Sequence, residues 1–318
     1  MADNRQDKIN NASYLYSTLI TVYLLVVLIM RLTGWGYDMG IIQNLILSQS
    51  MILVPTLVFI IMTRCSIRDT LRIRATHWAA IFIVPVFVVA LEPVMSLINS
   101  ISLLWVESGT TELSTELVAR YPLWVSTLLM AATPAIVEEL AYRGFILGNY
   151  RYGGRLAAII ISGIMFGVMH MNFNQMAYAM ILGILLGMLA EATGSILTTI
   201  YAHFCFNELS VLINYVVWKS PVLSKSMETS LTQGVGRDQL KATILVMCPA
   251  AFMGLCVALA ILFALSVING RRDYVLSMFT PKTNVQTNGE KVRMITVPLV
   301  VTLVVCIVVM SIFEFVLR

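Results

Sequence analysis

Charged residues are scarce in this chain. They make up 12% of the 318 residues, about half the roughly 25% of an average soluble domain. Hydrophobic residues account for 58%, and the mean hydropathy is +0.85. So few polar side chains cannot solvate a globule of this size, which excludes a soluble enzyme, a disordered chain and a nucleic-acid-binding protein. The composition indicates an integral membrane protein whose charges are confined to loops and to whatever site it serves.

Cysteine and histidine are also few. The five cysteines include no CxxC pair and no regular spacing, so we interpret them as small buried hydrophobic residues rather than a metal or redox motif. The chain has only three histidines, so any acidic side chain inside the membrane has few histidines with which it could pair.

Apolar runs long enough to cross a bilayer dominate what remains. Because the runs are continuously apolar and do not alternate, we expect helices rather than a barrel, in an all-α polytopic membrane bundle of eight or nine transmembrane helices. We divide one integrated domain into N-terminal membrane helices (1–121), motif-bearing helices (122–217), and a loop with C-terminal membrane helices (218–318). The nine runs lie near 14–30, 41–63, 78–104, 122–147, 156–170, 175–190, 196–217, 242–268 and 294–317.

Lys and Arg residues predict the orientation of the chain. Alternate segments outside these runs carry 13 of them, against 7 in the other segments, and the richer set includes the N-terminal tail. The positive-inside rule therefore predicts a multi-pass protein of the cell membrane with its N-terminus in the cytoplasm. Its partners are then the lipid bilayer and a substrate, with no nucleic acid.

The conspicuous exception to the avoidance of charge inside the apolar runs is a cluster of three charged residues in the fourth run. Glu138, Glu139 and Arg143 lie within six residues of the fourth run, where charged groups are costly and by default mark function. Glu139 and Arg143 are i,i+4 neighbours with the acid first, so the spacing predicts an ion pair. Glu138 is rotated by about 100° on the helix and must face another partner.

Polar residues in two other runs supply candidates for that partner. His170 ends the fifth run, and His203 and Asn207 lie one turn apart on one face of the seventh. An acid, two imidazoles and a carboxamide suit hydrolysis by water, in which Glu138 removes a proton, a histidine orients or deprotonates the water, and donors hold an oxyanion.

Three motifs resemble those of the CAAX protease and bacteriocin-processing family, the Abi-type intramembrane proteases related to the Ras-converting prenyl endopeptidase. They are Glu138-Glu139-x-x-x-Arg143, Phe166-x-x-x-His170 and His203-x-x-x-Asn207, in the family order. The resemblance implies an eight-helix core and an intramembrane endopeptidase acting on a peptide or a membrane-associated protein. It assigns water activation to Glu138 with His170, oxyanion stabilisation to His203 and Asn207, and structural support to Glu139, Arg143 and Phe166.

Several alternatives stay open at this point. The chain has no HExxH motif, and we favour a metal-free mechanism, but Glu138, His170 and His203 would also suit Zn²⁺ with a bound water. A non-catalytic scaffold or chaperone of the same family is the main alternative function. A proton-coupled transporter is a third, although it predicts inverted repeats and a second polar set that the sequence does not show.

Overall fold

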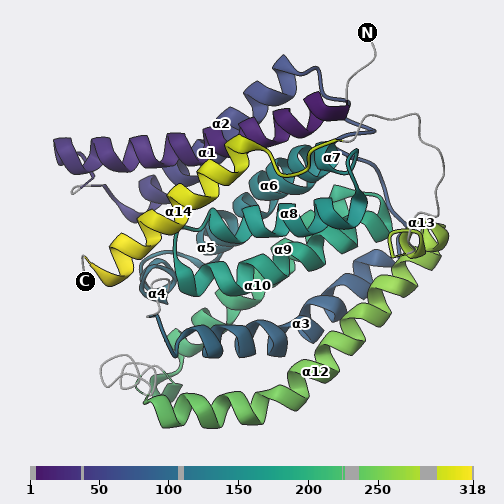
Figure 1. Cartoon of the computed structure of the whole chain (residues 1–318). Helices are drawn as coiled ribbons and strands as arrows, with labels where there is room; N and C mark the ends of the chain where they lie inside the picture. The colour runs from purple at the N-terminus through teal and green to yellow at the C-terminus, as the bar shows by residue number, and fades with distance from the viewer. Residues whose placement is uncertain are drawn as a thin grey trace.

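The structure is a computed structural model that describes residues 5–36, 39–106, 111–223, 225, 236–279 and 292–316. The described residues form helices and loops, with no strand among them (Figure 1). The first helices are α1 (Arg5–Thr33), α2 (Ile41–Met62), α3 (Ala80–Ser102) and α4 (Thr111–Arg120). A long irregular helix follows as α5 (Leu123–Ser126), η1 (Thr127–Ala132), α6 (Thr133–Glu139), η2 (Leu140–Ile146) and α7 (Leu147–Tyr150). The remaining helices are α8 (Arg155–Val168), α9 (Phe173–Thr193), α10 (Ile196–Lys219), α12 (Arg237–Ile268), α13 (Arg272–Leu276) and α14 (Val297–Phe315).

Eight of these helices are long and apolar enough to cross a membrane, and α8 is a shorter apolar helix of 14 residues. Each of the nine predicted runs falls on one of them, so the polytopic helix bundle is confirmed. The chain is therefore a multi-pass membrane protein.

The first helix begins at Arg5, whereas the predicted apolar run begins near residue 14, so the helix includes part of the polar N-terminal tail. Contacts with distant parts of the chain hold its first turns. The amide N–H of Arg293 donates to Gln6 Oε1 at 2.8 Å, and the hydroxyls of Ser13 and Tyr150 lie 2.7 Å apart. These tertiary bonds offset the low apolar content of this stretch.

The helix ends gather at two opposite faces of the bundle. At the amino-terminal face, where α1 begins, Arg155 of α8 donates to Ser277 after α13 at 2.9 Å. At the carboxyl-terminal face, where α14 ends, the rings of Phe173 and Phe315 lie 6.2 Å apart, and Asn174 of α9 donates to Asn99 of α3 at 2.9 Å. Figure 1 shows α13 at one side of the bundle, with α4 and the end of α14 at the other.

A buried ion pair locks the loop 63–79 onto the bundle at the amino-terminal face. Arg72 Nη1 lies 2.5 Å from Glu191 Oε1 near the end of α9, with the two side chains 1% and 0% exposed. The Tyr274 hydroxyl donates to Glu191 Oε2 at 2.8 Å, and Arg271 Nε donates to the Glu191 carbonyl at 2.7 Å. Arg72, which the positive-inside count includes among the Lys and Arg outside the apolar runs, is thus buried.

Glycines let α8 and α9 pack with their backbones almost in contact. A Cβ added at Gly163 would lie 2.5 Å from Ile184 Cγ1, and one at Gly167 would lie 2.7 Å from the Met176 carbonyl oxygen. Small residues four apart commonly allow such close approach in membranes. This packing sets the position of the residues 169–172 that join the two helices.

We expect Gly167→Val to lower the stability of the purified protein by about 1–3 kcal/mol, because backbone atoms of α9 cannot move away from the new side chain. Gly236→Val is the matched control, since a Cβ there would meet nothing within 4 Å. Denaturant titration in detergent micelles would measure both. An unchanged Gly167→Val protein would contradict the close packing.

Candidate active site

Two π-helical segments, η1 and η2, flank the adjacent glutamates in the fourth membrane helix. Pro134 has no amide hydrogen, and the Thr133 hydroxyl donates instead to the Leu128 carbonyl, five residues back, at 2.8 Å. Such wide turns are rare and often occur at functional sites. Between them, the short helix α6 carries Glu138 and Glu139 on different faces, as their adjacent positions predicted.

Glu139 is fully buried and contacts the side chains of Arg143 and His203. Arg143 Nη1 lies 2.5 Å from Glu139 Oε1, which confirms the predicted i,i+4 ion pair, and His203 Nδ1 lies 2.9 Å from the same oxygen. Arg143 Nη2 also donates to the Gly183 carbonyl of α9 at 3.2 Å, and its guanidinium lies 4.2 Å from the Phe166 ring centroid. The Glu139–Arg143 pair therefore connects the fourth membrane helix to α8, α9 and α10.

Glu138 faces a cavity instead. The Gln49 carboxamide of α2 donates to Glu138 Oε1 at 3.3 Å, and His203 Nε2 lies 4.0 Å from Glu138 Oε2. The sequence reasoning missed Gln49. Its signal was the polar cluster from Ser48 to Ser50 within an otherwise apolar run.

The contacts of the two histidines fix which ring nitrogen faces the cavity. His170 Nδ1 lies 2.8 Å from the Phe166 carbonyl, which can only accept, so Nδ1 carries a proton. His203 Nδ1 faces the Glu139 carboxylate in the same way. In its neutral form each ring therefore presents an unprotonated Nε2. The Phe166 ring makes edge contacts with both, at centroid distances of 5.2 Å and 5.8 Å.

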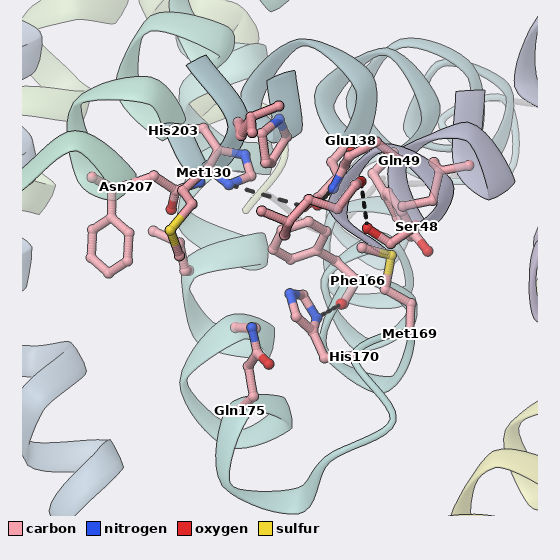
Figure 2. Close-up of a pocket in the computed structure, with 18 of the residues that line it drawn as sticks. Ser48, Gln49, Met130, Glu138, Phe166, Met169, His170, Gln175, His203 and Asn207 are labelled. Atoms are coloured by element: carbon pink, nitrogen blue, oxygen red, sulfur yellow. Dashed lines mark hydrogen bonds and ion pairs between the residues drawn. The ribbon is translucent and has the colours of Figure 1, made fainter. Parts of the chain in front are cut away.

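The central cavity has a volume of about 580 Å³, within the range of ligand-binding pockets. Glu138, His170, His203 and Asn207 all line it, so the structure brings together the four residues predicted to be catalytic. Figure 2 shows them around one space, with Gln49 beside Glu138 and Gln175 beyond His170. Residues 169–172, which break the helical path between α8 and α9, contribute Met169 and His170 to its wall, where irregular backbone is tolerated in a membrane.

The residues do not form a metal-binding set. Among the described residues, no three His, Cys, Asp or Glu side chains lie together in a way that could hold a metal ion. The proposed Zn²⁺ ligands Glu138, His170 and His203 therefore do not fit the metal in this arrangement, and no catalytic step is derived through it.

Removing Arg143 should be strongly destabilising, because it leaves the Glu139 charge buried and unpaired. We expect Arg143→Met to lower the free energy of unfolding by about 3–5 kcal/mol. Glu139→Gln combined with Arg143→Met should lose less than the sum of the two single variants. Arg120→Met is the control, since its pair with Glu116 is exposed and contributes at most about 1 kcal/mol. Strictly additive losses in denaturant titrations would refute the coupling.

Comparison with known proteins identifies the segment that carries the site. Residues 120–209 match the family model described as type II CAAX prenyl endopeptidase Rce1-like, and all four candidate catalytic residues lie within them. No curated protein and no solved structure matches the chain. The match confirms the resemblance based on the three motifs, and supports an intramembrane CAAX-protease activity in general terms, with a peptide or protein as substrate. Residues 120–209 are therefore similar to the Rce1-like family of CAAX proteases.

Proposed function

We propose that the protein is an intramembrane endopeptidase that hydrolyses a peptide bond in a peptide or membrane-associated protein. One observation carries the proposal: Glu138 faces the central cavity 4.0 Å from His203, while the neighbouring Glu139 is neutralised by Arg143. If both glutamates were purely structural, each would be paired with a partner inside the bundle, and neither would need to face the cavity. Glu138 is instead placed where it can meet water and a substrate.

Glu138 is the group that removes a proton from water in this proposal. The unprotonated Nε2 of His170, which lines the same cavity, assists by orienting the water. The water oxygen forms a bond to the scissile carbonyl carbon, and its proton moves to Glu138. When the carbon–nitrogen bond breaks, that proton passes to the leaving amine, so Glu138 returns to its carboxylate form.

Asn207 and His203 are the proposed donors to the oxyanion. The Asn207 carboxamide can donate as it stands. His203 donates from Nε2 only when its ring carries both protons, since Nδ1 already faces Glu139. In that form the two glutamates, Arg143 and His203 sum to zero charge, which suits a buried cluster better than a net charge does.

The membrane assignment extends the same proposal. We place the protein in the cell membrane with the amino-terminal face in the cytoplasm, on the distribution of Lys and Arg.

Glu138→Gln should lower the rate of peptide hydrolysis by about 10²–10⁴-fold, the usual contribution of a general base, while leaving the fold intact. The assay incubates purified protein with a proteome-derived peptide mixture and reads new termini by mass spectrometry. Glu92→Gln, a change at an intramembrane acid of α3 that does not line the cavity, should keep wild-type activity. Wild-type cleavage by Glu138→Gln would contradict the proposed role of Glu138 and the mechanism built on it.

Asn207→Leu tests the oxyanion role separately. We expect kcat to fall by about 10²–10³-fold with little change in KM, because the lost donor acts mainly in the transition state. The peptides identified in the preceding assay serve as substrates. A rise in KM at constant kcat would instead assign Asn207 to substrate binding.

A further inference from the structure

The central cavity lies mostly on one side of Glu138 along the membrane normal. On α10, which starts at the amino-terminal face, the lining begins at His203 and continues to Asn214. On α2, which runs the other way, the lining ends at Ile52, in the half nearer the carboxyl-terminal face. On the fourth membrane helix the lining runs from Leu129 to Tyr142, so only Tyr142 lies beyond Glu138 toward the amino-terminal face. On α9 the lining lies in the first half of the helix, nearer the carboxyl-terminal face. Most of the cavity therefore lies between Glu138 and the carboxyl-terminal face.

One wall of this path is polar. Asn207, Ser210 and Asn214, here called the polar track, lie at i, i+3 and i+7, so they share one face of α10. The rest of the lining is mostly apolar, with Leu19 and Ile20 of α1 among its residues. An extended peptide has both kinds of surface, since its backbone needs hydrogen-bond partners and its side chains can lie against apolar residues.

The cavity wall carries almost no charge. Glu138 is its one charged residue of the Asp, Glu, Lys and Arg types among the described lining residues. Neutral His170 presents an Nε2 lone pair, which repels an anion, and the charge of a doubly protonated His203 is already balanced by the two glutamates and Arg143. A free carboxylate near the scissile bond would thus be buried beside Glu138 without a cation, at a large electrostatic cost.

We infer that the cavity admits an uncharged, internal segment of an extended peptide, and that this segment enters from the carboxyl-terminal face along the polar track. The inference rests on the proposed endopeptidase function and adds its route of access and its substrate class. Cleavage then occurs several residues away from a free C-terminal carboxylate.

Cysteine labelling tests the route without any hydrolysis. A membrane-impermeant maleimide is applied to either side of sealed vesicles, and labelled peptides are identified by mass spectrometry, so the native cysteines stay in place. Asn214→Cys should react from the side that labels Lys219→Cys at the end of α10, and not from the side that labels Arg68→Cys in the loop 63–79. Val216→Cys, at a 57% exposed position two residues away outside the cavity wall, should stay unlabelled as a lipid-facing control.

Thiosulfonate reagents of equal size test the charge preference. At Ser210→Cys, an anionic reagent should react about tenfold more slowly than a neutral one, after normalisation to the same ratio at Lys219→Cys, because Glu138 repels it. Adding Glu138→Gln should largely remove this difference.

Three results would overturn the inference: labelling of Asn214→Cys from the amino-terminal side, no labelling from either side, or equal normalised rates for the anionic and neutral reagents. None of them depends on peptidase activity. Failure of the proposed function would instead appear as wild-type cleavage by Glu138→Gln in the peptide assay.

Discussion

The ion pair between Glu139 and Arg143 is the interaction on which the site depends, because neither charge is tolerated in the membrane without the other. Both residues of the pair lie in one helix, but each also forms a hydrogen bond with a residue of another helix. Glu139 binds His203 on α10, and Arg143 binds the Gly183 carbonyl on α9. The relative positions of three helices are therefore fixed at one point. The residue next to this pair, Glu138, is turned toward the cavity as a consequence.

Much of this arrangement could be predicted from the sequence. The nine apolar runs and the i,i+4 pair follow from strong local rules, namely the length needed to cross a bilayer and the cost of an unpaired charge. The gathering of Glu138, His170, His203 and Asn207 was expected from their motifs. The structure places all four around one cavity, while their catalytic roles stay predictions.

Other features depend on which helices are neighbours, and sequence spacing does not give that. The bond from His203 to Glu139 links residues 64 positions apart, and the contact of Gln49 with Glu138 links residues 89 positions apart. The helical start of the chain at Arg5 was missed for the same reason, since contacts with distant residues hold it. The Arg72–Glu191 pair likewise joins the loop 63–79, which lies outside the apolar runs, to the end of α9.

The contacts of Phe166 explain why the residue one turn before His170 is aromatic. Its carbonyl receives His170 Nδ1, its ring edges contact both imidazoles, and its face covers the Arg143 guanidinium. The Phe166 ring thus contacts the Arg143 guanidinium and both imidazoles, and it also lines the cavity. Only an aromatic ring combines a face that attracts a cation with edges that pack against imidazoles.

Gln49 extends the site beyond the segment that matches the family model. The matched segment spans residues 120–209, whereas the carboxamide that donates to Glu138 comes from α2, outside it. Transplanting the segment into another membrane scaffold would carry over Glu138 and its histidines but leave this donor behind. A functional chimera therefore has to keep α2 together with the segment, so the smallest transferable unit of this protein is longer than its recognisable motif.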